Sequence, residues 1–188
     1  MHEVDVIDAK WALLGDFVGR GDVQKILGSF NCTLEGLIDS LKGKHTWEEE
    51  GKPQANLAKY LECELDSYFT SKGLISTTDQ NSDLVRCSDV VQYKSDVVAH
   101  LSGKSESRII CEIEMRPNFE KDMVKFQIAN KNNLLHLAVL IVVLDRKKIN
   151  PGYGTMPEYA LVKEKIVEFS PDFPVLLLGL ELSTLMSS

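Results

Sequence analysis

Three carboxylate side chains, those of Asp96, Glu112 and Glu114, fall on two predicted strands that a short turn at Gly103 joins as a hairpin. Over 108–115, apolar residues at the odd-numbered positions alternate with a set at the even-numbered positions that contains Glu112 and Glu114. Because strand side chains switch faces at every residue, Glu112 and Glu114 share a face. Asp96, on the preceding strand, can face the same pair. Acids this close repel one another unless a cation or protons lie among them. Such an oxygen-rich set suits Mg²⁺, which binds one or two carboxylates, keeps several waters and binds phosphate oxygens.

The Glu-x-Glu pair alone also fits a solvated strand surface, which is the commoner situation for such pairs. Asp96 lies sixteen residues upstream of Glu112, on the neighbouring strand, and this third acid favours a metal site over a plain surface.

Length and composition predict one soluble domain over residues 1–188. With 44% hydrophobic residues, 188 residues suffice for a single full core. The longest apolar run, 134–144, is too short to span a bilayer, and the acidic start of the chain is unlike a secretory signal. The four cysteines are far apart and lack nearby histidine partners, which disfavours zinc. We therefore expect a cytoplasmic protein with reduced thiols and no membrane partner.

Charge is distributed unevenly along the chain. The net charge is −7, yet residues 115–150 carry seven Lys or Arg against three acids, a local +4, which leaves −11 for the rest. Cations that hold phosphates beside acids that hold a metal would serve phosphodiester cleavage. Lys121 and Lys125 alternatively belong to the solvated face of an ordinary helix.

The hydrophobic pattern predicts an α/β protein in which a mixed central sheet is flanked by helices. Residues 1–50 are expected to form a helical N-terminal part, and 53–188 the core. In addition to the hairpin, helices are expected over about 6–19, 23–28, 33–42, 53–70 and 117–130, and another helix is expected to begin at a capping box at Thr155. Buried strands are expected at 134–144 and 174–182. The helices around 28–33 also resemble, weakly, a helix-turn-helix.

Glu64 lies within the apolar stripe of the predicted helix over 53–70. An acid there is unusual unless it is paired or ligates something, so Glu64 is a candidate outer member of the site. The alternative is an edge position whose carboxylate reaches water.

The order Asp96, Glu112-Ile113-Glu114, helix, apolar strand resembles the PD-(D/E)xK nucleases, and within them type II restriction endonucleases of the BamHI and BglII kind. The Glu-x-Glu sequence matches the BamHI variant of a motif that usually reads Glu-x-Lys. The chain departs from the common pattern by Ser95 before the aspartate and by having no lysine at position 114. The resemblance extends to the end of the chain, whereas the first eighty residues match no motif of the family.

The resemblance implies a restriction-endonuclease-like fold and Mg²⁺-dependent hydrolysis of double-stranded DNA at a specific sequence, with Mn²⁺ as a substitute ion. It implies that Asp96, Glu112 and the carbonyl of Ile113 hold the metal, and that Glu114 orients or deprotonates the attacking water or ligates a second ion. It also implies a homodimer that places one subunit on each DNA strand. The expected DNA contacts are Arg116, Asn118, Lys121, Lys125, Arg146, Lys147, Lys148, Asn150 and Tyr153.

Two other functions stay open. One is a metal-dependent nuclease of repair or recombination, which would share the chemistry without strict sequence specificity. The other is a non-catalytic DNA-binding regulator that uses the N-terminal helices. The sequence leaves the recognition site, the number of metal ions and the identity of the general base undetermined.

Overall fold

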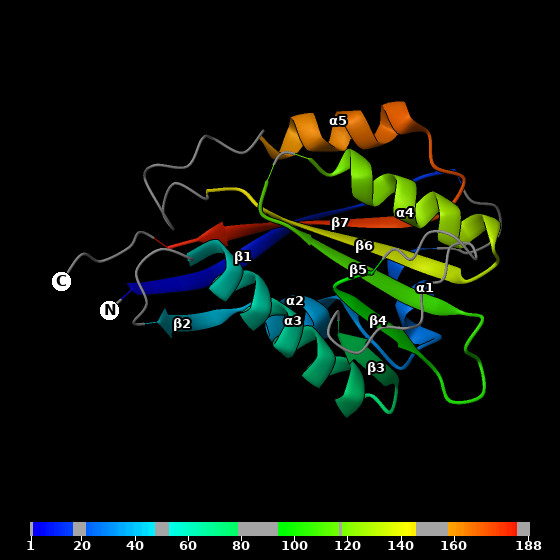
Figure 1. Ribbon diagram of the computed structural model, residues 1–188, viewed down its shortest axis with the longest axis horizontal. Helices are drawn as coiled ribbons and strands as arrows, with labels where there is room; N and C mark the ends of the chain where they lie inside the picture. The colour runs from blue at the N-terminus through cyan, green and yellow to red at the C-terminus, as the bar shows by residue number, and fades with distance from the viewer. Residues whose placement is uncertain are drawn as a thin grey trace.

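Seven strands form one mixed sheet in the computed structural model, and helices cover both of its faces (Figure 1). The structure describes residues 2–16, 22–47, 53–78, 94–116, 118–145 and 158–183. The strands run in the order β2-β1-β7-β6-β5-β4-β3. Their bounds are β1 His2–Leu14, β2 Gly43–Trp47, β3 Ile75–Thr78, β4 Val97–His100, β5 Arg108–Glu114, β6 Leu135–Val143 and β7 Val175–Leu182. The α/β class with a mixed, helix-flanked sheet is therefore confirmed.

The helices divide between the two faces of the sheet. Helices α1 (Val23–Gly28), α2 (Leu34–Leu41) and α3 (Pro53–Ser71) pack on one face, and α4 (Glu120–Lys131) and α5 (Tyr159–Phe169) pack on the other (Figure 1). Each layer has its own hydrophobic core, which is the usual result when both faces of a sheet are buried.

The three central strands β5, β6 and β7 are parallel, while the strands outside them are antiparallel. All nine residues of β6 except His136 are buried, as the unbroken apolar run predicted. The predicted hairpin is also confirmed, since β4 pairs antiparallel with β5 and Val97 lies opposite Cys111. These pairings bring the segment before β4 next to the carboxyl end of β5.

The predicted first helix over 6–19 is wrong, because residues 2–14 form strand β1. This strand pairs antiparallel with β2 on one side and β7 on the other, and a register shift between Val6 and Asp8 interrupts its alternation. The irregularity leaves Ile7 51% exposed and gives the apolar positions a spacing that imitates a helix. Strand β2 likewise occupies part of the predicted polar connector, and β3 was not predicted.

The other expected helices are present with small changes at their ends. Asp22 caps α1, and Thr33 caps α2 by accepting a hydrogen bond from the Gly36 amide, as its sequence predicted. Helix α4 starts at Glu120, later than predicted. Helix α5 starts at Tyr159 with Glu158 at its N-cap and no side-chain capping bond, and Thr155 lies outside the described residues. Among the described residues, no helix is both long and apolar enough to cross a bilayer.

Candidate active site

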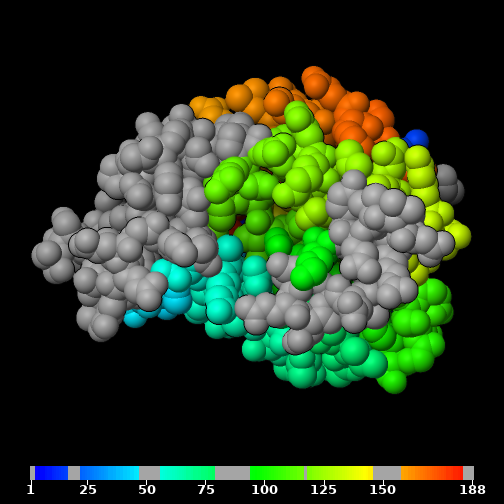
Figure 2. All heavy atoms as spheres, viewed as in Figure 1, coloured from blue at the N-terminus to red at the C-terminus, as the bar shows by residue number. Residues whose placement is uncertain are grey.

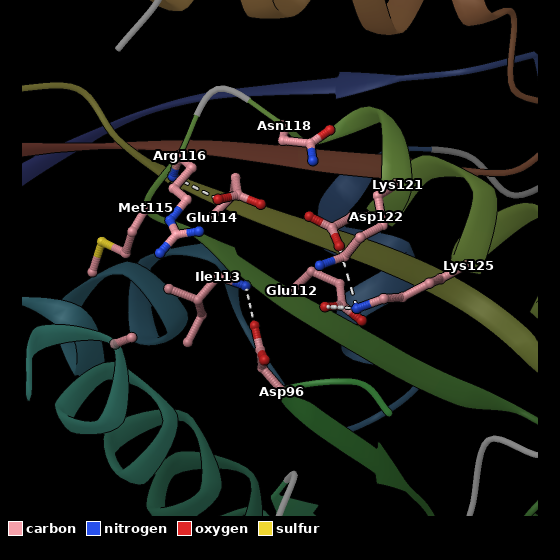
Figure 3. A pocket seen from close by; sticks show the side chains of 11 residues that line it. Asp96, Glu112, Ile113, Glu114, Met115, Arg116, Asn118, Lys121, Asp122 and Lys125 are labelled. Atoms are coloured by element: carbon pink, nitrogen blue, oxygen red, sulfur yellow. Dashed lines mark hydrogen bonds and ion pairs between the residues drawn. The ribbon is translucent and has the colours of Figure 1, made fainter. Parts of the chain in front are cut away.

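A polar pocket opens at the carboxyl end of β5, between α4 and the start of α3. The molecular surface is hollowed there between the two helices (Figure 2). The cavity measures about 360 Å³, which is room for a phosphate group with several waters. Its lining residues are Ala58, Asp96, Glu112, Ile113, Glu114, Met115, Arg116, Asn118, Lys121, Asp122 and Lys125 (Figure 3).

The alternation of β5 places Glu112 and Glu114 on the α4 side of the sheet. Cys111 and Ile113 belong to the core under α1–α3, while Ile110 belongs to the core under α4 and α5. Glu112 and Glu114 have the parity of Ile110, so they project toward α4, as Figure 3 shows. The predicted common face of the two glutamates is confirmed.

Asp96 reaches the same place from the bend before β4. Its Oδ2 accepts a hydrogen bond of 2.6 Å from the backbone N–H of Ile113, the residue between the two glutamates. This bond crosses the hairpin and holds the Asp96 carboxylate at the end of β5. The sequence-predicted trio of Asp96, Glu112 and Glu114 is therefore brought together at one pocket.

The two carboxylate oxygens of Glu112 have different surroundings. Glu112 is only 2% exposed, and its Oε2 lies 2.7 Å from Nζ of Lys125. Its Oε1 is buried without a hydrogen-bond partner. Burial, followed by the negative charge of Asp96, raises the pKa of Glu112 to about 8, against the opposing influence of Lys125. An unpartnered buried carboxylate oxygen is costly unless something binds it.

Glu114 lies nearer the surface and interacts with both the backbone and α4. Its Oε1 accepts a hydrogen bond from the Arg116 amide. Burial is the main cause that raises the pKa of Glu114 to about 7; the bond from the Arg116 amide opposes the rise, and the nearby Asp122 carboxylate adds to it. Glu114 is thus an acid whose proton is exchanged near neutral pH.

Lys125 and Asp122 enter the site from the inner face of α4. Lys125 is 8% exposed and lies 3.3 Å from Oδ1 of Asp122 as well as against Glu112. Burial acts to lower the pKa of Lys125, but the charges and hydrogen bonds of Glu112 and Asp122 outweigh it, and the pKa is raised. The alternative that places Lys125 on a solvated helix face is thus wrong.

Sequence reasoning did not identify Asp122 as a site residue or Lys125 as part of the carboxylate cluster. The signal was present in the helical spacing, because both fall among the apolar inward positions Phe119, Met123 and Phe126. A charged residue within a buried stripe needs a partner, and the partners available were the acids of the preceding strand.

The remaining predicted site residues divide into three groups. Arg116, Asn118 and Lys121 line the mouth of the pocket and are exposed. Glu64 does not line it and instead acts electrostatically on Tyr60 of the same helix. Arg146, Lys147, Lys148, Asn150 and Tyr153 lie outside the described residues.

The donor set of the pocket fits a hard divalent cation that keeps part of its water shell. The carboxylates are oxygen donors, and Oε1 of Glu112 lacks a partner. Among the described residues, no three Asp, Glu, His or Cys side chains form a complete metal-binding group. Waters and substrate oxygens would therefore have to complete the coordination, as is usual for Mg²⁺.

The chain matches no protein-family model, and a search of curated proteins finds no similar sequence.

Proposed function

We propose that the protein is a Mg²⁺-dependent endonuclease that hydrolyses phosphodiester bonds of double-stranded DNA, with a restriction-endonuclease-like fold. The observation that carries the proposal is the convergence of Asp96, Glu112 and Glu114 on one pocket, where Oε1 of Glu112 is buried and unpartnered. The resemblance to type II restriction endonucleases further implies that cleavage takes place at a specific DNA sequence.

The arrangement of the elements supports the proposed fold. The acidic hairpin β4–β5 is followed by α4 and then by the buried strand β6, which pairs parallel with β5. This is the order on which the resemblance rests, and it places the acids at one end of the sheet. Ligands of open α/β sheets commonly bind outside the carboxyl ends of the strands.

Asp96 and Glu112, with the carbonyl of Ile113, would hold the metal ion. When bound, a divalent cation lowers the pKa of water and stabilises negative charge on a phosphate. The Ile113 amide keeps Asp96 in place, and Lys125 holds Oε2 of Glu112, so that Oε1 would remain available to the ion.

Glu114 is the general base in this proposal. A pKa of about 7 suits a group that must accept a proton at neutral pH. Glu114 takes a proton from the attacking water, whose oxygen forms a bond to phosphorus as the bond from phosphorus to the leaving oxygen breaks. The leaving oxygen takes up a proton from solvent water and departs as a hydroxyl group. The Arg116 amide, which donates to Oε1 of Glu114, orients that carboxyl group.

DNA would approach the pocket along the exposed side chains at its mouth. Arg116 and Lys121 supply positive charge, and Asn118 offers an amide that can read a base edge. The basic segment 146–148, with Asn150 and Tyr153, would add further contacts, and a homodimer would treat both strands alike.

The test is cleavage of supercoiled plasmid DNA by the purified protein with Mg²⁺, with Mn²⁺ and with excess EDTA. Cleavage that depends on the cation is the expected result, and equal cutting in EDTA would contradict the proposal. Cleavage of a random DNA pool separates a site-specific enzyme from a repair or recombination nuclease, because only the former leaves a defined sequence at the cut ends. DNA binding without any cation-dependent cleavage would instead favour the non-catalytic regulator.

A further inference from the structure

Lys125 lies between two buried carboxylates at the base of the pocket, in the way that a metal ion bridges acidic ligands (Figure 3). We propose that Lys125 is the fixed second cation of this site, so that each chain binds one divalent ion and not two. The inference rests on the proposed function, and it extends it to the number of ions and to a residue that holds the site together.

The burial of Lys125 calls for a role beyond packing. Its ammonium is 2.7 Å from Oε2 of Glu112 and 3.3 Å from Oδ1 of Asp122, and all three side chains are at most 9% exposed. Buried ion pairs contribute little net stability over apolar side chains of similar size, because desolvation offsets the attraction. The stability of the fold alone therefore does not account for a lysine in this position.

The unequal surroundings of the Glu112 oxygens leave room for one ion. Oε2 is held by Lys125, whereas Oε1 is buried, without a partner, in a residue that lines the cavity. Oε1 is therefore the oxygen of Glu112 that would be free to bind an ion. A second ion bridging Glu112 and Asp122 would have to displace the ammonium.

Formal charges agree with a single ion. With all four acids ionised, as metal binding requires, Asp96, Glu112, Glu114 and Asp122 together with Lys125 carry −3, and the exposed Arg116 and Lys121 at the mouth bring the pocket to −1. One bound divalent ion would bring the net charge of the pocket to +1, which a phosphodiester group of the DNA would neutralise. Two divalent ions would give +3, an excess that nothing in the described part of the pocket balances.

The test counts bound ions without DNA. The full-length protein is titrated with Mn²⁺ by calorimetry, and free Mn²⁺ is followed by electron paramagnetic resonance. Wild type and Lys125→Arg, which keeps the charge, should bind one ion per chain. Lys125→Met removes the charge at similar length, and it should bind a second ion or bind the first at least several-fold more tightly. Lys163→Met, an exposed lysine on α5, is the control and should match wild type.

Thermal unfolding of the same variants adds a second readout. Without divalent ions, Lys125→Met should unfold at a lower temperature than wild type, because Glu112 and Asp122 lose their counter-charge, and saturating Mn²⁺ should narrow the difference. If Lys125→Met does not fold, the counts for wild type and Lys125→Arg still decide the matter.

Two ions per wild-type chain would overturn this inference while leaving the proposed nuclease intact. Unchanged Mn²⁺ binding in a folded Lys125→Met variant would also overturn it, since the lysine would then be a packing element only. No Mn²⁺ binding and no cleavage by wild type would remove the proposed function itself and this inference with it.

Discussion

At the scale of single residues, the site depends on which carboxylate oxygens are already bonded. Asp96 and Glu114 each accept a hydrogen bond from a backbone amide, and Glu112 accepts one from the ammonium of Lys125. Each acid is therefore held in place through one of its two oxygens. Fixed acceptors of this kind need little reorganisation when charge develops during a reaction, which is the main source of electrostatic catalysis.

Replacing any of these acids by its amide should abolish most cleavage without unfolding the protein. Asp96→Asn, Glu112→Gln and Glu114→Gln each keep the shape of the side chain but remove its charge, and loss of a preorganised electrostatic group costs about 10²–10³-fold or more in rate. Binding of cognate DNA should persist or tighten, because repulsion of the phosphates is reduced. Single-turnover cleavage and gel-shift binding measure the two effects. Near-native cleavage by one of these variants would mean that its acid lies outside the reaction.

Stability without divalent ions should fall as the pH rises. The pKa of Glu112 is about 8 in the folded protein against an ordinary 4.5, so the folded state binds this proton more tightly than the unfolded state. Stability from this group is complete below about pH 4.5 and is lost as the pH rises through 8. In a domain of this size, each 1 kcal/mol lost lowers the Tm by about 2–4 °C. Thermal unfolding from about pH 5 to 8 in EDTA should therefore show a decreasing Tm.

Glu112→Gln provides the control for that experiment, because it has no proton to lose at this position. Its Tm should decrease less over the same pH range than that of wild type. Parallel curves for the two proteins would show that Glu112 does not titrate in this range.

At the scale of elements, α4 completes the site that the hairpin begins. Its inward face carries Asp122 and Lys125 among apolar side chains, and its packing on β5 and β6 presses these two groups against Glu112 and Glu114. The strand β5 and the helix α4 are separated by only a few residues, so four of the charged groups come from one strand–helix unit, and Asp96 joins them from the bend before β4.

The end of β1 depends on a glycine, and this supports a prediction about stability. Gly15 has φ of +107°, and a Cβ there would lie 2.2 Å from the carbonyl oxygen of Phe173. The close approach lets the Asp16 amide donate to Pro171, which joins β1 to the segment before β7. Gly15→Ala should therefore reduce the free energy of unfolding by about 2 kcal/mol or more, measured in urea.

Two other glycines serve to separate the effect of a positive φ from the effect of a steric clash in that experiment. Gly73 has φ of +81° with open space around it, so Gly73→Ala should reduce the free energy of unfolding by only about 1 kcal/mol. Gly28 ends α1 in open space with no positive φ, so Gly28→Ala should be within about 0.5 kcal/mol of wild type. Equal losses at Gly15 and Gly73 would show that the contact with Phe173 is unimportant.

The elements that the sequence predicted well are those whose pattern is local. The unbroken run of β6, the Thr33 cap of α2 and the alternation of β5 each follow from neighbouring residues. Strand β1 was mistaken for a helix because its identity comes from pairing with β7, distant in sequence, and because its irregularity at Ile7 hides the alternation. The carboxylate trio was predictable from strand parity, whereas the inward turn of Lys125 required the packing of α4.

At the scale of the whole molecule, the charge distribution would restrict how DNA binds under the proposed function. The net charge of −7 opposes general attraction to a polyanion, so the proposed affinity for DNA would have to come from a limited basic surface. Arg116 and Lys121 lie on that surface, at the mouth of a pocket whose interior is acidic. The basic segment 146–148 follows β6, the strand next to β5, and lies outside the described residues.

Removing one cation from the mouth should weaken binding to every DNA sequence alike. Each phosphate contact contributes about 0.9 to the slope of log K against log salt, so Arg116→Ala or Lys121→Ala should each make the slope shallower by about one. If the basic segment contacts phosphates, Lys147→Ala and Lys148→Ala should make the slope shallower in the same way. If the amide of Asn118 or Asn150 reads a base, replacing that residue by Ala should instead reduce the discrimination between cognate and non-cognate DNA by about 1–3 kcal/mol.

The measurement is a salt titration of binding to cognate and non-cognate duplexes in Ca²⁺ or with the Glu112→Gln background, so that cleavage does not interfere. Lys104→Ala is the matched control, because Lys104 is exposed in the turn before β5, at the opposite end of that strand from the pocket. Lys104→Ala should keep the wild-type slope. If Arg116→Ala and Lys121→Ala keep it too, DNA does not cross the mouth of the pocket, and the proposed orientation of the substrate is wrong.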